Sequence, residues 1–170
     1  MKVTECLNTE HGVFLAQLRV LERMLDKKSS PKELRAAMSI IAEAVEKHRE
    51  AEEKIFYPAI ARECGAGLSP IHVMEAEHRE IGRCIQGVAS GDGNIPELAR
   101  AFVDTLRQHI AKEINVLFPL AEEKIPTAEL EQMACQCVEQ YHQAAGVPST
   151  SGGGTETRWP PPPDQPSSGG

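Results

Sequence analysis

The sequence has no excess of positive charge. Its 18 lysine and arginine residues are outnumbered by 25 aspartate and glutamate residues, which gives a formal net charge of -7 and a pI near 5.4. Nucleic acids and anionic membranes bind basic surfaces, so this balance argues against either one as the main partner.

Long apolar runs are also missing. No stretch approaches the roughly 20 apolar residues of a membrane span, and the segment from Met1 to Cys6 lacks the apolar core of a secretion signal. We therefore expect a cytoplasmic protein that has no membrane partner.

The five cysteines do not form a disulfide framework. Their odd number suits a reducing compartment. Cys135 and Cys137 are too close together for a zinc-finger pair, so we interpret them as helix residues.

Glycine and proline are scarce in the first 146 residues, which are rich in Ala, Glu, Leu, Lys and Ile. This composition predicts an all-α domain over residues 1–146. Residues 147–170 are a Gly/Ser/Pro-rich stretch that cannot bury a core, and we expect a disordered tail that contributes nothing to the site.

Turn and capping signals place the helices. Ser30, followed by Pro31 and Glu33, is expected to cap the second helix, and Pro58 is expected to kink it. The expected helices run from Asn8 or Thr9 to about 28, 31 to about 63, 71 to about 89, 95 to about 124 and 127 to about 145. Four long helices with short turns predict an antiparallel up-down-up-down bundle, with the shorter fifth helix at the C-terminal end.

The stretch from His48 to Pro58 recurs in altered form from His109 to Pro119. Each copy places a histidine four residues before a glutamate, and an aromatic residue and a proline follow. Residues four apart share one helix face, and periodicity makes that face otherwise apolar. The next residues expected on this apolar face are Ile55 and Ala59 in the first copy and Val116 and Leu120 in the second.

Glu52 and Glu113 are therefore expected to point into the core. A buried, unpaired carboxylate costs several kcal/mol, which is roughly the scale of a whole domain's stability. Each carboxylate needs a positive partner, and a metal ion supplies one.

Four histidines are expected to converge at the level of these glutamates. In an antiparallel hairpin, two residues at equal distances from the turn lie at the same height. The midpoint of each successive pair of the four histidines falls on or beside an expected turn. Six ligand-type side chains should then surround one point: His11, His48, Glu52, His78, His109 and Glu113.

Mixed imidazole and carboxylate ligands suit iron, manganese or zinc better than calcium or copper(I). Iron is the leading choice. Two carboxylates can bridge two metal ions, and six protein ligands shared between two ions leave open positions for a small diatomic ligand or a water.

These motifs, taken together, resemble the hemerythrin-like (HHE cation-binding) family over about residues 5–142. The resemblance rests on Glu10-His11, His48-x3-Glu52 with Phe56-Tyr57-Pro58, Glu77-His78, and His109-x3-Glu113 with Phe118-Pro119. It implies a four-helix bundle with two non-haem iron ions, held by the four histidines and bridged by the two glutamates. It also implies binding of oxygen or nitric oxide.

The chain departs from the oxygen-carrying members at Met74. They have a histidine there, one turn before the residue that matches His78. A thioether is a poor ligand for oxidised iron, so either one iron is expected to be less saturated or Glu75 or a water completes it, and simple oxygen carriage becomes doubtful.

Two functional hypotheses remain open. The first is a non-haem di-iron protein for oxygen, nitric oxide or redox sensing or for iron handling. The second is a di-iron enzyme that reduces peroxide or nitric oxide or assists iron-sulfur cluster repair, although no general acid beyond the ligands is evident.

The remaining polar residues near the motifs are interpreted as structural. Glu53 is expected to face solvent. Glu10 and Glu77 could accept hydrogen bonds from ligand imidazoles, but solvation is favoured. His72 and His142 are interpreted as structural, and Phe14 and Phe56 as walls of the site or as core.

Overall fold

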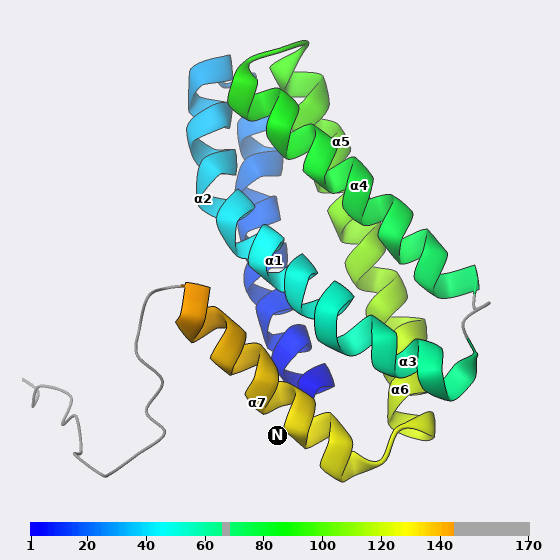
Figure 1. Ribbon diagram of the computed structural model, residues 1–170. Coiled ribbons are helices and arrows are strands. Elements are labelled where there is room, and N and C mark those ends of the chain that lie inside the picture. The colour runs from blue at the N-terminus through cyan, green and yellow to red at the C-terminus, as the bar shows by residue number, and fades with distance from the viewer. Residues whose placement is uncertain (66–68, 145–170) are drawn as a thin grey trace, which may run out of the picture.

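The computed structural model describes residues 1–65 and 69–144, and the secondary structure within these ranges is helical (Figure 1). The helices are α1 (Val3–Asp26), α2 (Pro31–Ala51), α3 (Tyr57–Cys64), α4 (Ser69–Ser90), α5 (Ile95–Lys112), α6 (Phe118–Lys124) and α7 (Thr127–Ala144). Two π-helical turns, η1 (Glu52–Phe56) and η2 (Glu113–Leu117), join α2 to α3 and α5 to α6. The all-α prediction is confirmed. The predicted tail, residues 147–170, lies outside the described residues.

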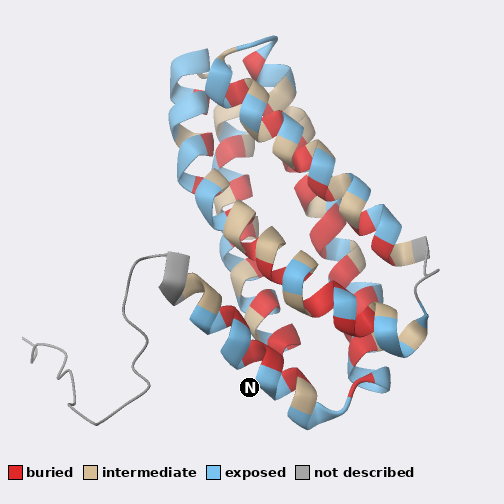
Figure 2. Cartoon of the chain, in the orientation of Figure 1, coloured by how far each residue is buried: buried red, intermediate tan, exposed pale blue. Residues whose placement is uncertain are grey.

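The long helices form a bundle in which α1 packs on α2 and α5, and α4 packs on α2 and α5 (Figure 1). None of the described helices is long and apolar enough to cross a membrane. Buried residues follow the inner faces of the helices (Figure 2).

The core has two parts, above and below the predicted cluster. The upper part includes Phe14 and Leu18 of α1. The other part, which we call the lower core, includes Leu7 of the same helix. Because His11 lies between them, the polar cluster sits where the two apolar parts of the core meet.

The cap of the second helix is as predicted. Ser30 accepts a hydrogen bond from the backbone N–H of Glu33, and Glu33 in turn accepts one from the backbone of Ser30. The predicted start of the first helix was wrong, because α1 begins at Val3. Val3 and Leu7 are buried in the lower core, so tertiary packing extends the helix beyond its local sequence signals.

The two π-helical turns shift the apolar face by one residue. The backbone N–H of Tyr57 donates to the carbonyl of Glu52, five residues back, and η2 repeats this bond. The first buried position after each glutamate is therefore Phe56 or Leu117, rather than the predicted Ile55 or Val116, whereas Ala59 is buried as predicted. Ile55 is only partly buried and Val116 is 51% exposed.

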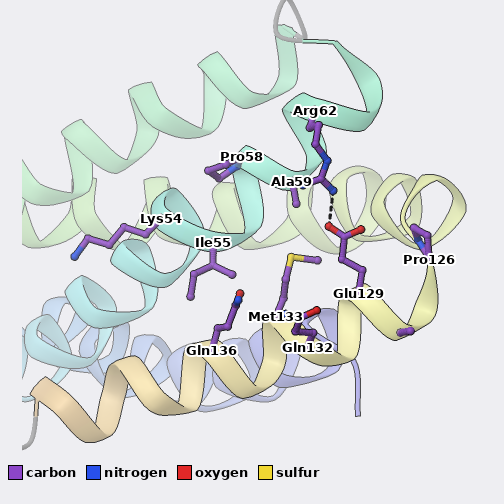
Figure 3. Close-up of a pocket in the computed structure, with 11 residues that line it drawn as sticks. Lys54, Ile55, Pro58, Ala59, Arg62, Pro126, Glu129, Gln132, Met133 and Gln136 are labelled. Carbon is purple, nitrogen blue, oxygen red and sulfur yellow. Dashed lines mark hydrogen bonds and ion pairs between the residues drawn. The ribbon is translucent and has the colours of Figure 1, made fainter.

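Helix α7 packs against α1, α2 and η1. At its N-terminal end Glu129 pairs with Arg62 of α3, and Met133 is buried beside them. A cleft of about 570 Å³ lies between α3 and α7 around these side chains (Figure 3). Helix α7, which is the predicted fifth helix, thus packs on the bundle at the end that holds the π-helical turns.

Candidate metal centre

Six side chains meet where the two parts of the core join. Each histidine comes from a different long helix, and each glutamate is the first residue of a π-helical turn. Every one of the six is at most 3% exposed. They are the residues that the sequence predicted: His11, His48, Glu52, His78, His109 and Glu113.

The first half of the cluster joins His11 and His48 to both carboxylates. The Nε2 atoms of the two histidines are 3.0 Å apart. Nε2 of His48 lies 2.9 Å from Oε1 of Glu52, and Nε2 of His11 lies 3.2 Å from Oε2 of Glu113. Ligand atoms of these four residues lie within 4.8 Å of one another, so they could hold a metal ion.

The second half consists of His78, His109 and again Glu52. The Nε2 atoms of the histidines are 3.1 Å apart, and Nε2 of His78 lies 3.2 Å from Oε2 of Glu52. These three residues also bring ligand atoms within 4.8 Å of one another. Glu52 therefore presents one oxygen to each half, which is the arrangement that a bridging carboxylate needs.

Tyr57 is a polar residue of the site that the sequence analysis missed. Its hydroxyl donates to Oε1 of Glu113 at 2.8 Å and lies 3.4 Å from Nε2 of His78. Its ring stacks on His78, with centroids 5.6 Å apart and an interplanar angle of 17°. Phe118 holds the same place in the second copy and stacks on His11. Aligning the two sequence copies pairs Tyr57 with Phe118, and this pairing was the signal in the sequence that could have pointed to Tyr57.

The electrostatics of the cluster favour a bound cation. Burial opposes a charge on His48, but the charge of Glu52 and the hydrogen bond with Glu10 raise the pKa of His48 to about 10. Burial also opposes ionisation of Glu52, yet its histidine partners hold the pKa of Glu52 well below the usual value. Burial, followed by the charges of Glu52 and Glu113, raises the pKa of Tyr57, so the phenol keeps its proton.

The donor atoms fit a metal ion. Among the described residues, the buried atoms Oε1 of Glu52 and Oε2 of Glu113 have no hydrogen-bond partner, since the short approach of His48 to Glu52 is not aligned as a hydrogen bond. Buried carboxylate oxygens in this state are costly, and a metal ion would satisfy them. Imidazole and carboxylate donors together suit iron, manganese or zinc.

Three glutamates outside the cluster pair with the Nδ1 atoms of its histidines, and we call them the outer carboxylates. The pairs are Glu10 with His48 at 2.5 Å, Glu53 with His78 at 2.9 Å and Glu77 with His109 at 3.4 Å. The first two are hydrogen bonds, whereas the third is an ion-pair contact without hydrogen-bond geometry. An acceptor at Nδ1 fixes the ring and leaves Nε2 free for a metal.

The prediction that Glu53 faces solvent was therefore wrong, as was the preference for solvation of Glu10 and Glu77. Each lies beside the inner face of its own helix, and its side chain reaches a histidine of a neighbouring helix. Periodicity within one helix does not register such a contact.

His11 differs from the other three histidines. Among the described residues its buried Nδ1 atom has neither a hydrogen-bond partner nor a pairing carboxylate, whereas the Nδ1 atoms of the other three each lie beside a glutamate. In the first sequence copy Glu53 follows Glu52, whereas in the second copy Ile114 follows Glu113. The second copy thus lacks the carboxylate that would correspond to Glu53, and the two halves of the cluster have unequal outer contacts.

Replacing Glu53 with Gln is expected to weaken iron binding about 10- to 100-fold, because a neutral amide is a poorer acceptor for the Nδ1–H of His78. Competition against a chelator of known affinity measures the change. Glu50→Gln is the matched control, since Glu50 pairs with Lys54 on the surface of the same segment. Equal affinities in the two variants would contradict the orienting role.

The structure also locates Met74, which stands where a further ligand was expected to be missing, and its neighbour Glu75. Met74 is buried in the lower core, in the same apolar cluster as Tyr57. Glu75 is 43% exposed and faces His72, so the prediction that it could replace the missing ligand was wrong. The side chain of His142 lies outside the described residues.

Aromatic rings wall the cluster. Phe14 meets His48 edge-on, with ring centroids 5.1 Å apart. Phe56 forms a second layer and packs edge-on against Phe118, which stacks on His11. The sequence predicted both Phe14 and Phe56 near the site, and the rings exclude water from its apolar sides.

Histidines and carboxylates gathered inside a helical bundle define a metal-binding helical protein. Within that class the chain belongs to the hemerythrin family, because residues 3–121 match the hemerythrin HHE cation binding domain.

Curated relatives include the iron-sulfur cluster repair protein YtfE of Escherichia coli (strain SMS-3-5) and that of Escherichia fergusonii. Each is 33% identical to this chain over 122 residues, which cover 63% of this chain and 56% of the relative. The chain thus spans little more than half the length of these relatives. No solved structure matches the chain.

Proposed function

We propose that the chain binds two non-haem iron ions at this cluster and acts in iron handling for the repair of iron-sulfur clusters. The domain that carries the site would be residues 1–146, an up-down-up-down bundle with residues 147–170 as a separate tail. The proposed ligands are His11, His48, Glu52, His78, His109 and Glu113.

The observation that carries the proposal is the position of Glu52. Its Oε1 atom faces His48 and its Oε2 atom faces His78, so one carboxylate serves both halves of the cluster. Tyr57 fixes Glu113 through its other oxygen, Oε1, which leaves Oε2 toward His11 and His109.

Bound iron would supply redox chemistry toward a small diatomic ligand such as oxygen or nitric oxide. The chain's own contribution is to orient the imidazoles, to exclude water and to hold a proton at the hydroxyl of Tyr57. That hydroxyl is a hydrogen-bond donor that the sequence analysis did not find, and it could orient a small ligand for reaction, so we choose reactive chemistry over sensing alone. The names of the curated relatives support the same choice.

A repair assay tests this function. A protein with a [4Fe–4S] cluster is damaged by peroxide or nitric oxide and then incubated with the iron-loaded chain. Recovery should exceed that given by the metal-free chain and by an equal amount of free ferrous iron. Equal recovery in all three cases would contradict a role in repair.

Tyr57→Phe is expected to retain both iron ions and to change the affinity for azide or nitric oxide. The substitution keeps the ring that stacks on His78 and removes only the hydroxyl, whose short contact is to Glu113 and whose longer one, at 3.4 Å, is to Glu52. Loss of one buried hydrogen bond should also cost about 1–3 kcal/mol of stability. Ligand titration followed by optical absorption checks the first effect, and unchanged affinity would show that Tyr57 has no role at the open position.

A further inference from the structure

The outer carboxylates differ in their second partner, the group that each one contacts besides its histidine. Glu53 accepts a hydrogen bond from Arg49 at 2.9 Å, and Glu77 accepts one from Lys112. Within the described ranges Glu10 has no such cation. Among the described residues its partners are His48 and the hydroxyl of Tyr141, which donates to Oε2 of Glu10 at 3.1 Å.

Tyr141 lies on α7, outside the segment 3–121 that matches the family. Its side chain packs on the lower core beside Cys137, which is buried. Burial and the charge of Glu10 raise the pKa of the Tyr141 phenol, so it remains a hydrogen-bond donor. The same oxygen of Glu10 therefore joins α7 to the Nδ1 atom of His48.

The first half of the cluster depends on this contact more than the second half does. His78 and His109 each face an outer carboxylate that a cation holds in place. In the first half Nδ1 of His11 has no partner among the described residues, so Glu10 orients the only ring with an outer acceptor. Glu10 is 31% exposed, so without its second partner it could turn toward water.

We propose that Tyr141 is a positioning residue for the iron ion of the His11 and His48 half, and that it acts through Glu10. This inference rests on the proposed di-iron site. Its consequence is that α7 controls how tightly one of the two ions is retained, although no residue of α7 is a proposed ligand.

The experiment compares release of iron from the full-length wild type and the Tyr141→Phe variant to a chelator. Phenylalanine keeps the packing and removes only the donor to Glu10. We expect one of the two ions to leave about tenfold faster and the other at the wild-type rate, since loss of an outer contact typically weakens a metal site 10- to 100-fold. Mössbauer spectra should show a changed environment for one ion only.

Two controls separate positioning from a general loss of structure. Glu139→Gln alters an exposed residue of the same helix and should release iron as the wild type does. In a Glu10→Gln background, Tyr141→Phe should add no further effect, because both changes interrupt one path.

Wild-type release kinetics in Tyr141→Phe, equal acceleration for both ions, or additive effects in the double variant would overturn the inference while leaving the iron site intact. A wild-type protein that takes up no iron would overturn the proposed site, and this inference with it.

Discussion

Glu52→Gln should take up essentially no iron. Glutamine has nearly the same size, but it carries no charge and cannot bridge two ions with two equivalent oxygens. The cluster would then have one carboxylate, Glu113, to balance two cations in a buried site, which is unfavourable. Elemental analysis after iron loading and desalting measures the loss.

The matched control is Glu43→Gln, because Glu43 lies on α2, the helix that leads directly to Glu52, and its side chain is 77% exposed. It should hold as much iron as the wild type. Full iron content in Glu52→Gln would show that Glu52 does not bridge the two halves.

Phe56→Ala is expected to lower the free energy of unfolding by about 3–5 kcal/mol, the usual cost of truncating a fully buried phenylalanine. Phe56 is fully buried, and its ring packs against Tyr57 and Phe118. Each of these rings stacks on a histidine of the cluster, so the cavity would also loosen the site. Urea unfolding of the metal-free protein measures the stability.

Ile40→Ala is the control for this change, since Ile40 is 72% exposed on α2. It should alter stability by less than about 0.5 kcal/mol. A similar loss in both variants would mean that Phe56 is not part of a well-packed core.

The six clustered residues could be predicted because two simple regularities agreed. Helix periodicity placed His48 and Glu52 on the apolar face, and equal distances from the turns placed the histidines at one level. Both regularities depend only on regular helix geometry in the segments that precede the two glutamates, and those segments are α-helical.

In the turn that follows each glutamate the same reasoning failed, although Ala59, one turn further on, is buried as predicted. A π-helical turn adds one residue, so Phe56 and Leu117 are buried where Ile55 and Val116 were expected. Proline at 58 and 119 indicated a disturbance of the helix. It did not indicate whether the helix would kink or widen, because either can accommodate the missing N–H.

The outer contacts of the site could not be read from one helix at a time. Glu10 meets His48 of the next helix and Tyr141 of the last one, more than 130 residues away. These contacts depend on how the helices pack, and neither periodicity nor capping signals specify that.

The measurement that tests the central claim most directly is a Mössbauer spectrum of the wild-type protein loaded with isotope-enriched iron, together with its iron content. We expect two iron ions per chain in two distinct environments, magnetically coupled through the shared carboxylates. One ion per chain, or two ions without coupling, would contradict a centre bridged by Glu52.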